Sequence, residues 1–391
     1  MIHQSLAAAP AGFEGLKYLV VGSGFYGSVM AERIAADKGG RVVVLEKRGH
    51  IGGNSWSEND PETGIEWHRY GSHIFHTGDE QVWAYLNRFC AFNGYRHKVR
   101  ARCGRRSYAL PVNLDTINSF YGTALTPDEA EAFMRGEAAK ERVAVPANLE
   151  EKAVSVFGRP LYETLIKGYT KKHWGLHPKE LPPETIGRLP LRFDRGTDYF
   201  GDPRQGIPLE GYGKLFSNLL AHPGIDVYLN TDFFDVKDRL PEDCRVIYTG
   251  PMDQYFGCEY GTLGWRSLRL EKEALPAGDY QGTAVVNYSD ESVPFTRIHE
   301  FRHFHAERAY PADRTLIARE YPCECGPGRE PYYPVNTGAD RELLARYAAR
   351  AKADGRLLLG GRLGTYSYLD MDQCVASALA AYEKEVKNAA E

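Results

Sequence analysis

The residues best suited to chemistry by their types and spacing begin with a glycine-rich turn near the N-terminus. Residues 22–27 read G-S-G-F-Y-G, a G-x-G-x-x-G motif between an apolar run and a predicted helix. In such motifs the first glycine permits a tight turn, the second lets the backbone approach a pyrophosphate, and the third lets helix and strand pack closely. Gly22, Gly24, Phe25 and Gly27 are therefore predicted to bind a dinucleotide. The alternative is a glycine turn in an ordinary α/β domain.

An acidic residue and a second pair of glycines narrow the choice of cofactor. Glu46 ends a second apolar run, where it can accept hydrogen bonds from ribose hydroxyls and would repel a 2′-phosphate. Gly52-Gly53-Asn54 follows shortly after. An acid followed by Gly-Gly resembles the FAD enzymes that include amine oxidases, whereas an NAD fingerprint does not require the extra glycines. We expect Glu46, Lys47, Gly53 and Asn54 to bind FAD.

Two histidines follow in the run Y-G-S-H-I-F-H-T at residues 70–77. His73 and His76 are predicted to face the flavin, and His76 is the better candidate for hydrogen bonds to the ring or the ribityl chain. A second interpretation makes His73 a core histidine with a satisfied ring. A histidine pair can also suggest a metal, but no third ligand accompanies this one at a recognisable spacing, so we expect none.

The C-terminal part of the chain repeats the signal of a strand that runs into glycines and then a helix. An apolar run over 357–359 enters a Gly-Gly-Arg turn, and a helix is predicted over 371–386. A helix N-terminus aimed at the flavin would stabilise negative charge on its reduced form. The alternative is a strand-to-helix turn that simply needs its glycines. The predicted cofactor-binding residues here are Arg362, Tyr368, Asp370 and Met371.

These residues need a framework that brings both ends of the chain to one site. Apolar runs over 16–21 and 41–45 flank a helical stretch over 28–36, which makes a β-α-β unit of the usual length. Further helices are predicted within 79–92 and within 126–175, where Pro127 and Pro160 open helices. Further β structure is predicted over 188–199, 283–288, 295–301 and 357–359. The cofactor domain is therefore expected to be discontinuous in sequence.

Composition and charge restrict the class of protein. The chain has 391 residues, 43% hydrophobic and 26% charged, as in soluble globular proteins of two or three domains. Its net charge of -4 provides no general attraction for nucleic acid or membrane, so an anionic substrate must meet local positive charge. The seven cysteines are scattered and are expected to be reduced thiols. Without a signal peptide or an apolar run of ~20 residues, the protein is expected to be cytoplasmic.

Several longer segments resemble the bacterial UDP-galactopyranose mutases, and the resemblance covers most of the chain from Tyr18 onward. The segments are E-K-R-x-H-I-G-G-N (46–54), Y-G-S-H-I-F-H-T (70–77), I-K-G-Y-T-K-K-H-W-G (166–175), K-E-L-P (179–182), Q-G-I-P (205–208), Y-T-G-P-x-D-Q-Y-F (248–256), E-P-Y-Y-P-V-N (330–336) and G-G-R-L (360–363). Their number and spacing favour membership of this family.

The resemblance implies an α/β fold: a Rossmann-like FAD-binding domain of the amine-oxidase-like flavoproteins, with a helical insert domain and an antiparallel β-sheet domain that carries substrate contacts. The FAD-binding domain is expected at 1–80, 207–260 and 335–391, within which residues 1–15 lie outside the core. The helical domain is expected at 81–94 and 113–187. The sheet domain is expected at 95–112, 188–206 and 261–334.

The resemblance also implies an activity. The family interconverts UDP-galactopyranose and UDP-galactofuranose without net redox change, with reduced FAD as the working form and flavin N5 as the nucleophile at the anomeric carbon. The product supplies galactofuranose for cell-surface glycans. The implied partners are these two nucleotide sugars, an external reductant such as NAD(P)H and a second copy of the chain in a homodimer. The alternative is a FAD-dependent oxidoreductase of the amine-oxidase type.

Site residues carry over from the family by position. Arg188 and Arg297 match arginines that grip the diphosphate, and guanidinium groups suit phosphate oxygens. The segment around Arg188 resembles a mobile lid. The implied substrate-binding residues are Tyr169, Thr170, Trp174, Arg188, Tyr199, Arg297, Tyr333 and Tyr368, and the implied catalytic residues are Arg188, Arg297, His76 and His97.

His97 departs from the family pattern, because many members carry asparagine there, near the sugar and the flavin. Both side chains can donate a hydrogen bond, but histidine also titrates near neutral pH. The sequence therefore predicts an additional pH dependence of activity from His97.

Overall fold

The computed structural model describes residues 1–5, 12–186 and 189–387. Its first layer is a six-stranded sheet in the order β1-β10-β3-β2-β11-β17, and all of its neighbouring strands are parallel. These strands are β1 Ile2–His3, β2 Tyr18–Val21, β3 Val42–Leu45, β10 Ile225–Tyr228, β11 Arg245–Tyr248 and β17 Leu357–Leu359. The sequence V-V-V-L of β3 is buried throughout, as expected of a strand covered on both faces.

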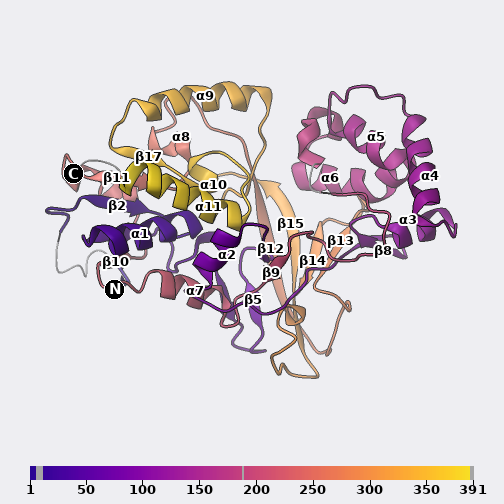
Figure 1. Ribbon diagram of the computed structural model, residues 1–391, viewed down its shortest axis with the longest axis horizontal. Coiled ribbons are helices and arrows are strands. Elements are labelled where there is room, and N and C mark those ends of the chain that lie inside the picture. The colour runs from indigo at the N-terminus through magenta and orange to yellow at the C-terminus, as the bar shows by residue number, and fades with distance from the viewer. Residues whose placement is uncertain (6–11, 187–188, 388–391) are drawn as a thin grey trace.

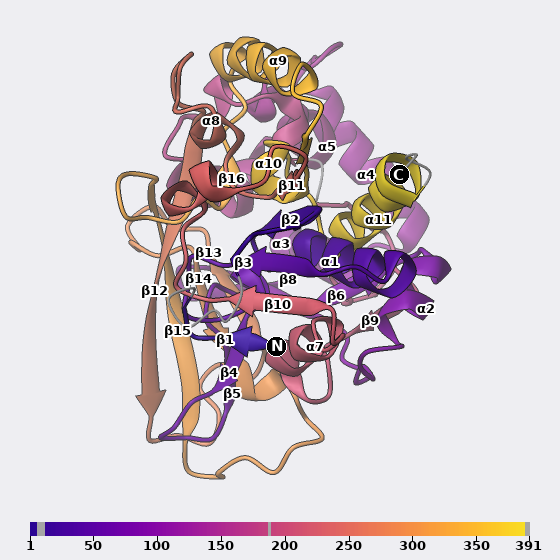
Figure 2. The same cartoon turned by 90° about the vertical axis from the view of Figure 1, so that its left-hand side faces the viewer.

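Helices cover this sheet and connect its strands (Figures 1 and 2). They are α1 Phe25–Lys38, α2 Glu80–Leu86, α7 Gly211–Leu219, α8 Met252–Tyr255, α9 Gly338–Lys352, α10 Gly361–Gly364 and α11 Met371–Ala381, which continues as a π-helical turn over Tyr382–Lys387. Helix α1 contacts α11, so the first and last helices of the chain lie side by side (Figure 2). The predicted β-α-β unit at the N-terminus and the predicted final strand and helix are confirmed.

A seven-stranded sheet forms the second part of the molecule, in the order β16-β12-β15-β14-β13-β7-β8. Its neighbours are antiparallel except for the parallel pair of β13 and β7. The strands are β7 Val99–Cys103, β8 Arg106–Leu110, β12 Trp265–Leu275, β13 Val285–Tyr288, β14 Arg297–Glu300, β15 Thr315–Glu324 and β16 Tyr333–Pro334. In Figure 1 these strands stand between the cofactor-type sheet on the left and a group of helices on the right.

That group of helices consists of α3 Leu114–Tyr121, α4 Pro127–Ala139, α5 Leu149–Leu161 and α6 Lys167–Trp174, with a π-helical turn over Tyr162–Ile166 between α5 and α6. Pro127 opens α4 behind a Thr126 capping box, as predicted. Gly158 has φ 68° and kinks α5, and Pro160 lies in the first turn after the kink. Gly175, at φ 69°, ends α6 just after Trp174.

Two short antiparallel strand pairs lie outside the two large sheets. Strand β4 (Ser57–Asn59) pairs with β5 (Glu66–His68), and β6 (Phe75–Thr77) pairs with β9 (Arg204–Gly206), all antiparallel. Among the described residues, no helix is long and apolar enough to cross a membrane.

Two sequence-based expectations about the fold are wrong. The segment 1–15 was expected outside the core, but its described residues contribute to it: Ile2–His3 forms the edge strand β1 beside β10, and the Phe13 side chain is buried under the same sheet. Residues 189–199 form no strand, only a bridge between Leu191 and Val112. There the backbone turns instead to hold the start of α3, because the Asp194 carbonyl accepts from the Leu114 amide at 2.9 Å.

The strands themselves support a division of the chain. The six-stranded sheet draws on segments within 1–80, 207–260 and 335–391, and the seven-stranded sheet draws on segments within 95–112 and 261–334. We propose that these are the discontinuous domains that the sequence suggests, with 113–187 as the helical part. The expected helical segment 81–94 differs, because its helix α2 contacts α11 and β6 rather than α3 to α6. Residues 189–206 contribute no strand to the seven-stranded sheet.

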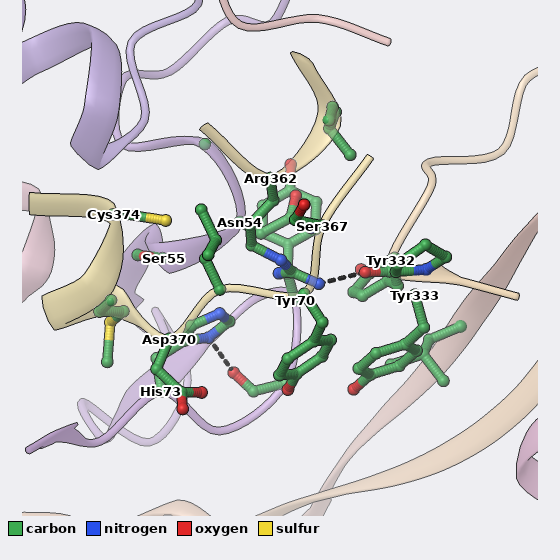
Figure 3. Close-up of a pocket in the computed structure, with 18 of the residues that line it drawn as sticks. Asn54, Ser55, Tyr70, His73, Tyr332, Tyr333, Arg362, Ser367, Asp370 and Cys374 are labelled. Carbon is green, nitrogen blue, oxygen red and sulfur yellow. Dashed lines mark hydrogen bonds between the residues drawn. The ribbon is translucent and has the colours of Figure 1, made fainter. Parts of the chain in front are cut away.

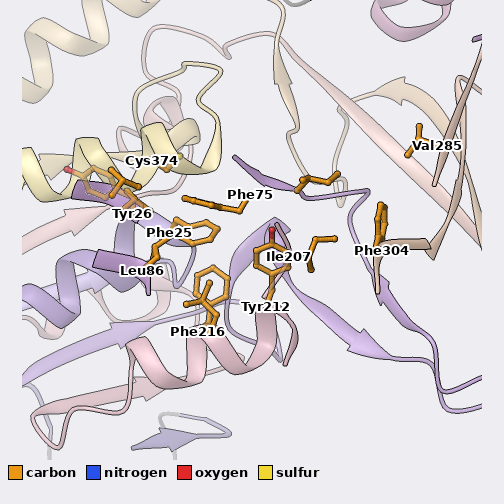
Figure 4. Packing of buried hydrophobic residues seen from close by; sticks show 14 of the residues in the cluster. Phe25, Tyr26, Phe75, Leu86, Ile207, Tyr212, Phe216, Val285, Phe304 and Cys374 are labelled. Atoms are coloured by element: carbon orange, nitrogen blue, oxygen red, sulfur yellow. The ribbon is translucent and has the colours of Figure 1, made fainter. Parts of the chain in front are cut away.

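Aromatic side chains form the core beneath the glycine turn (Figure 4). Phe25, the first residue of α1, lies 4.8 Å from the ring of Phe216 and 6.4 Å from that of Tyr212, measured between ring centroids. Both partners belong to α7 and are fully buried. Phe25 thus fixes the start of α1 against α7 and keeps the glycine turn in place.

We predict that Gly27→Ala destabilises the protein by about 1–3 kcal/mol, because overpacking a close contact forces backbone shifts. A Cβ atom at Gly27 would lie 2.0 Å from the carbonyl oxygen of Gly22. Urea unfolding of the purified protein measures the change. Gly24→Ala is the matched control, since a Cβ there meets no atom of the described residues within 4 Å; its cost should stay below about 1 kcal/mol. Equal losses in the two variants would contradict the packing role of Gly27.

Candidate active site

One large cavity, of about 1310 Å³, is lined by both sheets and by the helical part. The six-stranded sheet contributes the carboxyl ends of β2, β3 and β11, where ligands of open α/β sheets usually bind. The seven-stranded sheet contributes side chains of β14 and β15, and α6 closes a further side. One cavity therefore contacts both the glycine turn and the side chains of α6 and β14.

The glycine turn forms one wall of the cavity with the geometry that the motif predicts. Gly22 has φ 95°, and a Cβ there would lie 2.1 Å from Thr249 Oγ1. A Cβ on Gly24 would have no atom of the described residues within 4 Å, so the face of Gly24 is open to the cavity. Gly53, at φ 57°, packs against the Gly24 backbone. This wall can accept a phosphate group close to the main chain.

Glu46 lies at the end of β3 with its carboxylate in the cavity wall. The side chain is only 5% exposed. One oxygen accepts from the Ser23 amide at 3.0 Å and from the Ser23 hydroxyl at 2.7 Å, and the other accepts from the Arg48 amide at 3.0 Å. Each carboxylate oxygen can accept more than one hydrogen bond, so Glu46 is positioned by its neighbours while it keeps capacity for hydroxyl donors.

A cluster of charged groups lies beside Glu46. Arg48 binds the Glu330 carboxylate at 2.6 Å and the Asn54 side-chain oxygen at 2.9 Å. Lys47 lies 3.8 Å from Glu330 and is half exposed. Within the described part of the chain, Arg48 Nη1 is buried and has no hydrogen-bond partner. An unpaired buried N–H beside the glycine turn is suited to an anionic or carbonyl oxygen of a ligand.

Arg362 approaches the same cavity from the C-terminal part of the chain (Figure 3). Its guanidinium group donates to the Tyr332 carbonyl and lies 4.9 Å from the ring centroid of Tyr368. The Tyr368 ring stacks on Tyr333 at 5.4 Å. Within the described residues, Arg362 Nε is buried without a partner. Asp370 caps α11, which starts at Met371, so this helix start faces the cavity as expected.

His73 and His76 both line the cavity but differ in their partners. His73 Nδ1 is 2.7 Å from the Gly71 carbonyl oxygen, and burial lowers its pKa to about 4 (Figure 3). His76 Nδ1 is 2.7 Å from an oxygen of Asp202, and its ring stacks on Phe200. His73 is thus a neutral, internally bonded ring, and His76 is held at the cavity edge by a carboxylate.

The substrate-type residues gather where α6 meets β14. Tyr169, Thr170 and Trp174 of α6 all line the cavity. Arg297 Nε donates to the Tyr169 hydroxyl at 2.7 Å. Trp174 lies 6.3 Å from Tyr333, edge to face. The structure therefore brings together five of the predicted substrate residues, with Tyr199 and Tyr368 also in the lining. Arg188 lies outside the described residues.

Arg297 owes its position to a buried acid on the neighbouring strand. Glu320 of β15 lies opposite Arg297 in the antiparallel register, 3.4 Å from Arg297 Nε, and is 1% exposed. Burial alone would raise the pKa of Glu320, but the charge on Arg297 and a hydrogen bond from His299 outweigh it and hold that pKa well below the usual range. Burial opposes the charge on Arg297 as well, and Glu320 more than offsets this and raises the Arg297 pKa. The pair is ionised at neutral pH.

The structure contradicts the expected titration of His97. Its side chain is 5% exposed, its Nδ1 lies 3.0 Å from the Tyr95 hydroxyl, and its carbonyl accepts from the Tyr199 amide at 2.7 Å. Burial lowers the pKa of His97 to about 3, so the ring stays neutral near pH 7. His97 lines the cavity as predicted, but it adds no charge there near neutrality.

Lys172, on the same helix as Tyr169, is a residue that sequence reasoning missed. Its ammonium group donates to the carbonyls of Tyr288, Asp290, Val293 and Phe295 at 2.7–3.1 Å. Burial lowers the pKa of Lys172 to about 8, against the opposing charges of Asp290 and Glu291. It remains protonated at pH 7 and ties α6 to the segment that leads into β14 and Arg297.

Three further missed residues are Ser72, His299 and Glu320, all in the cavity lining. His299 lies two residues after Arg297 on β14, so strand alternation could have placed the two side chains on one face. The partnership with Glu320 depends on the register between β14 and β15, which no local pattern reveals.

The comparisons with known proteins agree with this architecture. The overall fold matches a crystal structure of reduced UDP-galactopyranose mutase, with a TM-score of 0.73 at 15% identity over 96% of this chain and 95% of that one. It also matches a putative protoporphyrinogen oxidase from Exiguobacterium sp. 255-15, with a TM-score of 0.63 at 15% identity over 95% and 99% of the two chains. The fold is therefore that of Rossmann-like, amine-oxidase-type flavoenzymes, as predicted.

Sequence relatives narrow this class to one family. The profile of UDP-galactopyranose mutases matches residues 164–368, and that of NAD(P)-binding Rossmann-like domains matches residues 20–89. A probable UDP-galactopyranose mutase of Klebsiella pneumoniae is 38% identical over 95% of both chains. A dTDP-fucopyranose mutase of Escherichia coli is also 38% identical, over 95% of this chain and 99% of that one. The chain belongs to the UDP-galactopyranose mutase family, an isomerase family, and family and fold together imply a flavin cofactor.

We predict that the free energy of unfolding falls as pH drops from about 6.5 toward 4. In this range the histidines of the unfolded chain take up protons, whereas the buried histidines of the folded protein stay neutral. Burial lowers the pKa from 6.5 to about 3 in His68, His97 and His173, and to about 4 in His73. His97→Asn should flatten the slope of unfolding free energy against pH by about 1.4 kcal/mol per unit in this window. Urea unfolding across the range measures it. An unchanged slope would contradict the neutral, buried state of His97.

We predict that Lys172→Met costs about 1–3 kcal/mol of stability, because four carbonyls lose their shared donor. Lys171→Met is the matched control: this neighbouring lysine makes a surface ion pair with Glu291, both side chains being at least one-third exposed. Its loss should cost less than about 1 kcal/mol. Chemical unfolding compares the two variants, and similar costs would show that Lys172 does not fasten α6.

Proposed function

We propose that this protein interconverts UDP-galactopyranose and UDP-galactofuranose by a non-redox ring contraction that uses reduced FAD. The observation that carries the proposal is the single cavity that runs from the glycine turn and Glu46 to Arg297, Tyr169 and Trp174. A cofactor site alone would suit any flavoenzyme of this fold. A guanidinium group, several tyrosine hydroxyls and a tryptophan at its far end suit a sugar nucleotide with a diphosphate.

The residues present fit FAD. The open face of Gly24 and the start of α1 suit the pyrophosphate, and Glu46 suits the ribose hydroxyls. The buried, unpartnered nitrogens of Arg48 and Arg362 suit further polar atoms of the cofactor. Lys47, Gly53, Asn54, Tyr368, Asp370 and Met371 complete the proposed contacts. When bound, reduced FAD would supply N5 as the nucleophile for the anomeric carbon.

The protein's own side chains would bind and orient the nucleotide sugar and shield the anomeric carbon from water. Glu320 and Tyr169 fix the position of Arg297. Arg297 would bind the diphosphate both in the intact nucleotide sugar and in UDP after the bond to the sugar breaks. Tyr199, Tyr333 and Tyr368 would donate to phosphate oxygens, while Tyr169, Thr170 and Trp174 would hold the uridine and the sugar. We further propose Arg188 as a second diphosphate ligand, with His76 and His97 beside the reacting sugar. Closure around the anomeric carbon would exclude water.

A second substrate has a specific observation in its favour. The dTDP-fucopyranose mutase relative is as similar in sequence as the probable UDP-galactopyranose mutase. Both names describe mutases that act on a nucleotide-linked pyranose. The fold relationship with oxidases leaves the FAD-dependent oxidoreductase as the alternative reaction.

We further propose a cytoplasmic homodimer, reduced by an external donor such as NAD(P)H, that supplies galactofuranose for cell-surface glycans.

The test is to incubate purified protein with UDP-galactofuranose, with and without dithionite, and to follow UDP-galactopyranose by chromatography, with dTDP-fucopyranose assayed in parallel. We predict conversion only with reduced flavin. Arg297→Ala should lose about 30- to 1000-fold in turnover, the usual cost of about 2–4 kcal/mol for a charge-assisted contact, while it retains FAD.

Arg269→Ala is a suitable control, because Arg269 lies on β12 and its side chain is exposed beside Tyr321 and Glu271. Its turnover should match that of the unaltered protein. Consumption of oxygen or NAD(P) with another substrate, and no sugar interconversion, would overturn the proposal. Preference for dTDP-fucopyranose would keep the reaction and change the substrate.

A further inference from the structure

Three side chains form a hydrogen-bonded chain in the wall of the cavity. Ser72 Oγ lies 2.6 Å from His299 Nδ1, and His299 Nε2 lies 3.1 Å from Glu320 Oε2. His299 and Glu320 are almost completely buried, and Ser72 is partly exposed in the cavity lining. Ser72 comes from the turn between β5 and β6, while the other two come from adjacent strands β14 and β15.

The charge on Glu320 fixes the direction of these hydrogen bonds. Its carboxylate is ionised, since Arg297 and His299 hold its pKa well below the usual range against the effect of burial. It can therefore only accept, and His299 Nε2 must carry a hydrogen. In the neutral ring Nδ1 is then the acceptor, and the Ser72 hydroxyl donates to it. If His299 takes up a second proton, Nδ1 becomes the donor and Ser72 turns its own hydrogen toward the cavity.

This inference rests on the proposed reaction, which needs a group that can take up a proton and return it. In the conversion of pyranose to furanose, the C1–O5 bond breaks, the C1–O4 bond forms, and one proton moves from O4 to O5. No electrons are gained or lost overall. The two neutral histidines His73 and His97 are poor proton acceptors, because burial lowers their pKa values to about 4 and 3. The His299 ring, in contrast, is hydrogen-bonded on one side to the Ser72 hydroxyl and on the other to the Glu320 carboxylate, which is the geometry that a proton relay requires.

We propose that Ser72 and His299 relay the proton between the two sugar oxygens. The O4–H bond first breaks toward Ser72 Oγ, and the Ser72 O–H bond breaks toward His299 Nδ1. Glu320 stabilises the resulting imidazolium. As the C1–O5 bond breaks, the proton returns from His299 through Ser72 to O5, and the deprotonated O4 then forms the C1–O4 bond. Ser72 touches the substrate in this scheme, while His299 acts through Ser72 and Glu320 holds the required tautomer.

The test uses the flavin-loaded, reduced protein and compares three variants. His299→Gln keeps an acceptor for Ser72 and a donor for Glu320 but cannot take up a proton, so it should fold, bind UDP within about 3-fold of normal and lose about 100-fold or more in kcat. Ser72→Ala should lose turnover to a similar degree. His299→Ala should lose turnover and regain part of it with added imidazole, whereas Ser72→Ala should gain nothing from imidazole.

His303→Ala is the matched control, because His303 pairs with Asp279 and Glu300 and is not among the residues that line the cavity. It should show normal kcat and no response to imidazole. The relay is overturned if His299→Gln turns over within about 3-fold of the unaltered protein, or if imidazole fails to restore any turnover to a folded, UDP-binding His299→Ala variant. If the unaltered protein does not interconvert the sugars, the proposed function itself fails. That result differs from the two outcomes above, in which the unaltered protein is active and a His299 variant contradicts the relay.

Discussion

The ion pair of Arg297 and Glu320 is the interaction on which the proposed substrate end of the cavity depends. Arg297 presents a positive charge to the cavity of a protein with net charge -4. A long, partly buried arginine would lose much of its value as a ligand if it were free to move. Glu320, on the adjacent strand, and the Tyr169 hydroxyl, on α6, restrict it from two sides. The same carboxylate orients His299 and, through it, Ser72.

In the cavity, buried histidines are neutral and Arg297 carries the positive charge. The cavity contains several histidines, and burial keeps His73, His97 and His173 neutral at physiological pH. Near Tyr169 and Trp174, positive charge for the proposed diphosphate comes from the Arg297 guanidinium group, whose charge does not depend on pH in this range. Lys172 serves a different purpose: it binds four carbonyls and holds α6 against the segment before Arg297. A binding site for an anion is thus built on a rigid frame.

Local sequence patterns predicted the glycine turn and the β-α-β unit that contains it. The glycine turn, Glu46 and the β-α-β unit depend on contacts between residues close in sequence, so their spacing carries the information. The edge strand Ile2–His3 was missed because its partner, β10, is more than 200 residues away. The β structure predicted over 188–199 is absent over 189–199, since the Asp194 carbonyl accepts from the Leu114 amide and holds that backbone at the start of α3.

The same limit applies to the site. Arg297 and Tyr169 could be named from a family resemblance, but Glu320 and His299 could not, because their roles follow from strand register. His97 shows the reverse error: its residue type suggests a titrating group, and its burial removes that property. The sequence therefore predicted which functional groups the site contains. Their protonation states depend on burial and on neighbouring charges, which only the folded structure reveals.

A double-mutant cycle on UDP-galactopyranose affinity, measured by titration calorimetry on the flavin-loaded protein, tests whether Glu320 holds Arg297 in place. If Glu320 holds Arg297 in its binding position, Glu320→Gln should weaken binding in the unaltered background. In the Arg297→Ala background the same change removes an uncompensated negative charge and should strengthen binding. The two effects should differ by more than about 1 kcal/mol, whereas equal effects within about 0.5 kcal/mol would show that the residues act independently and would contradict the account.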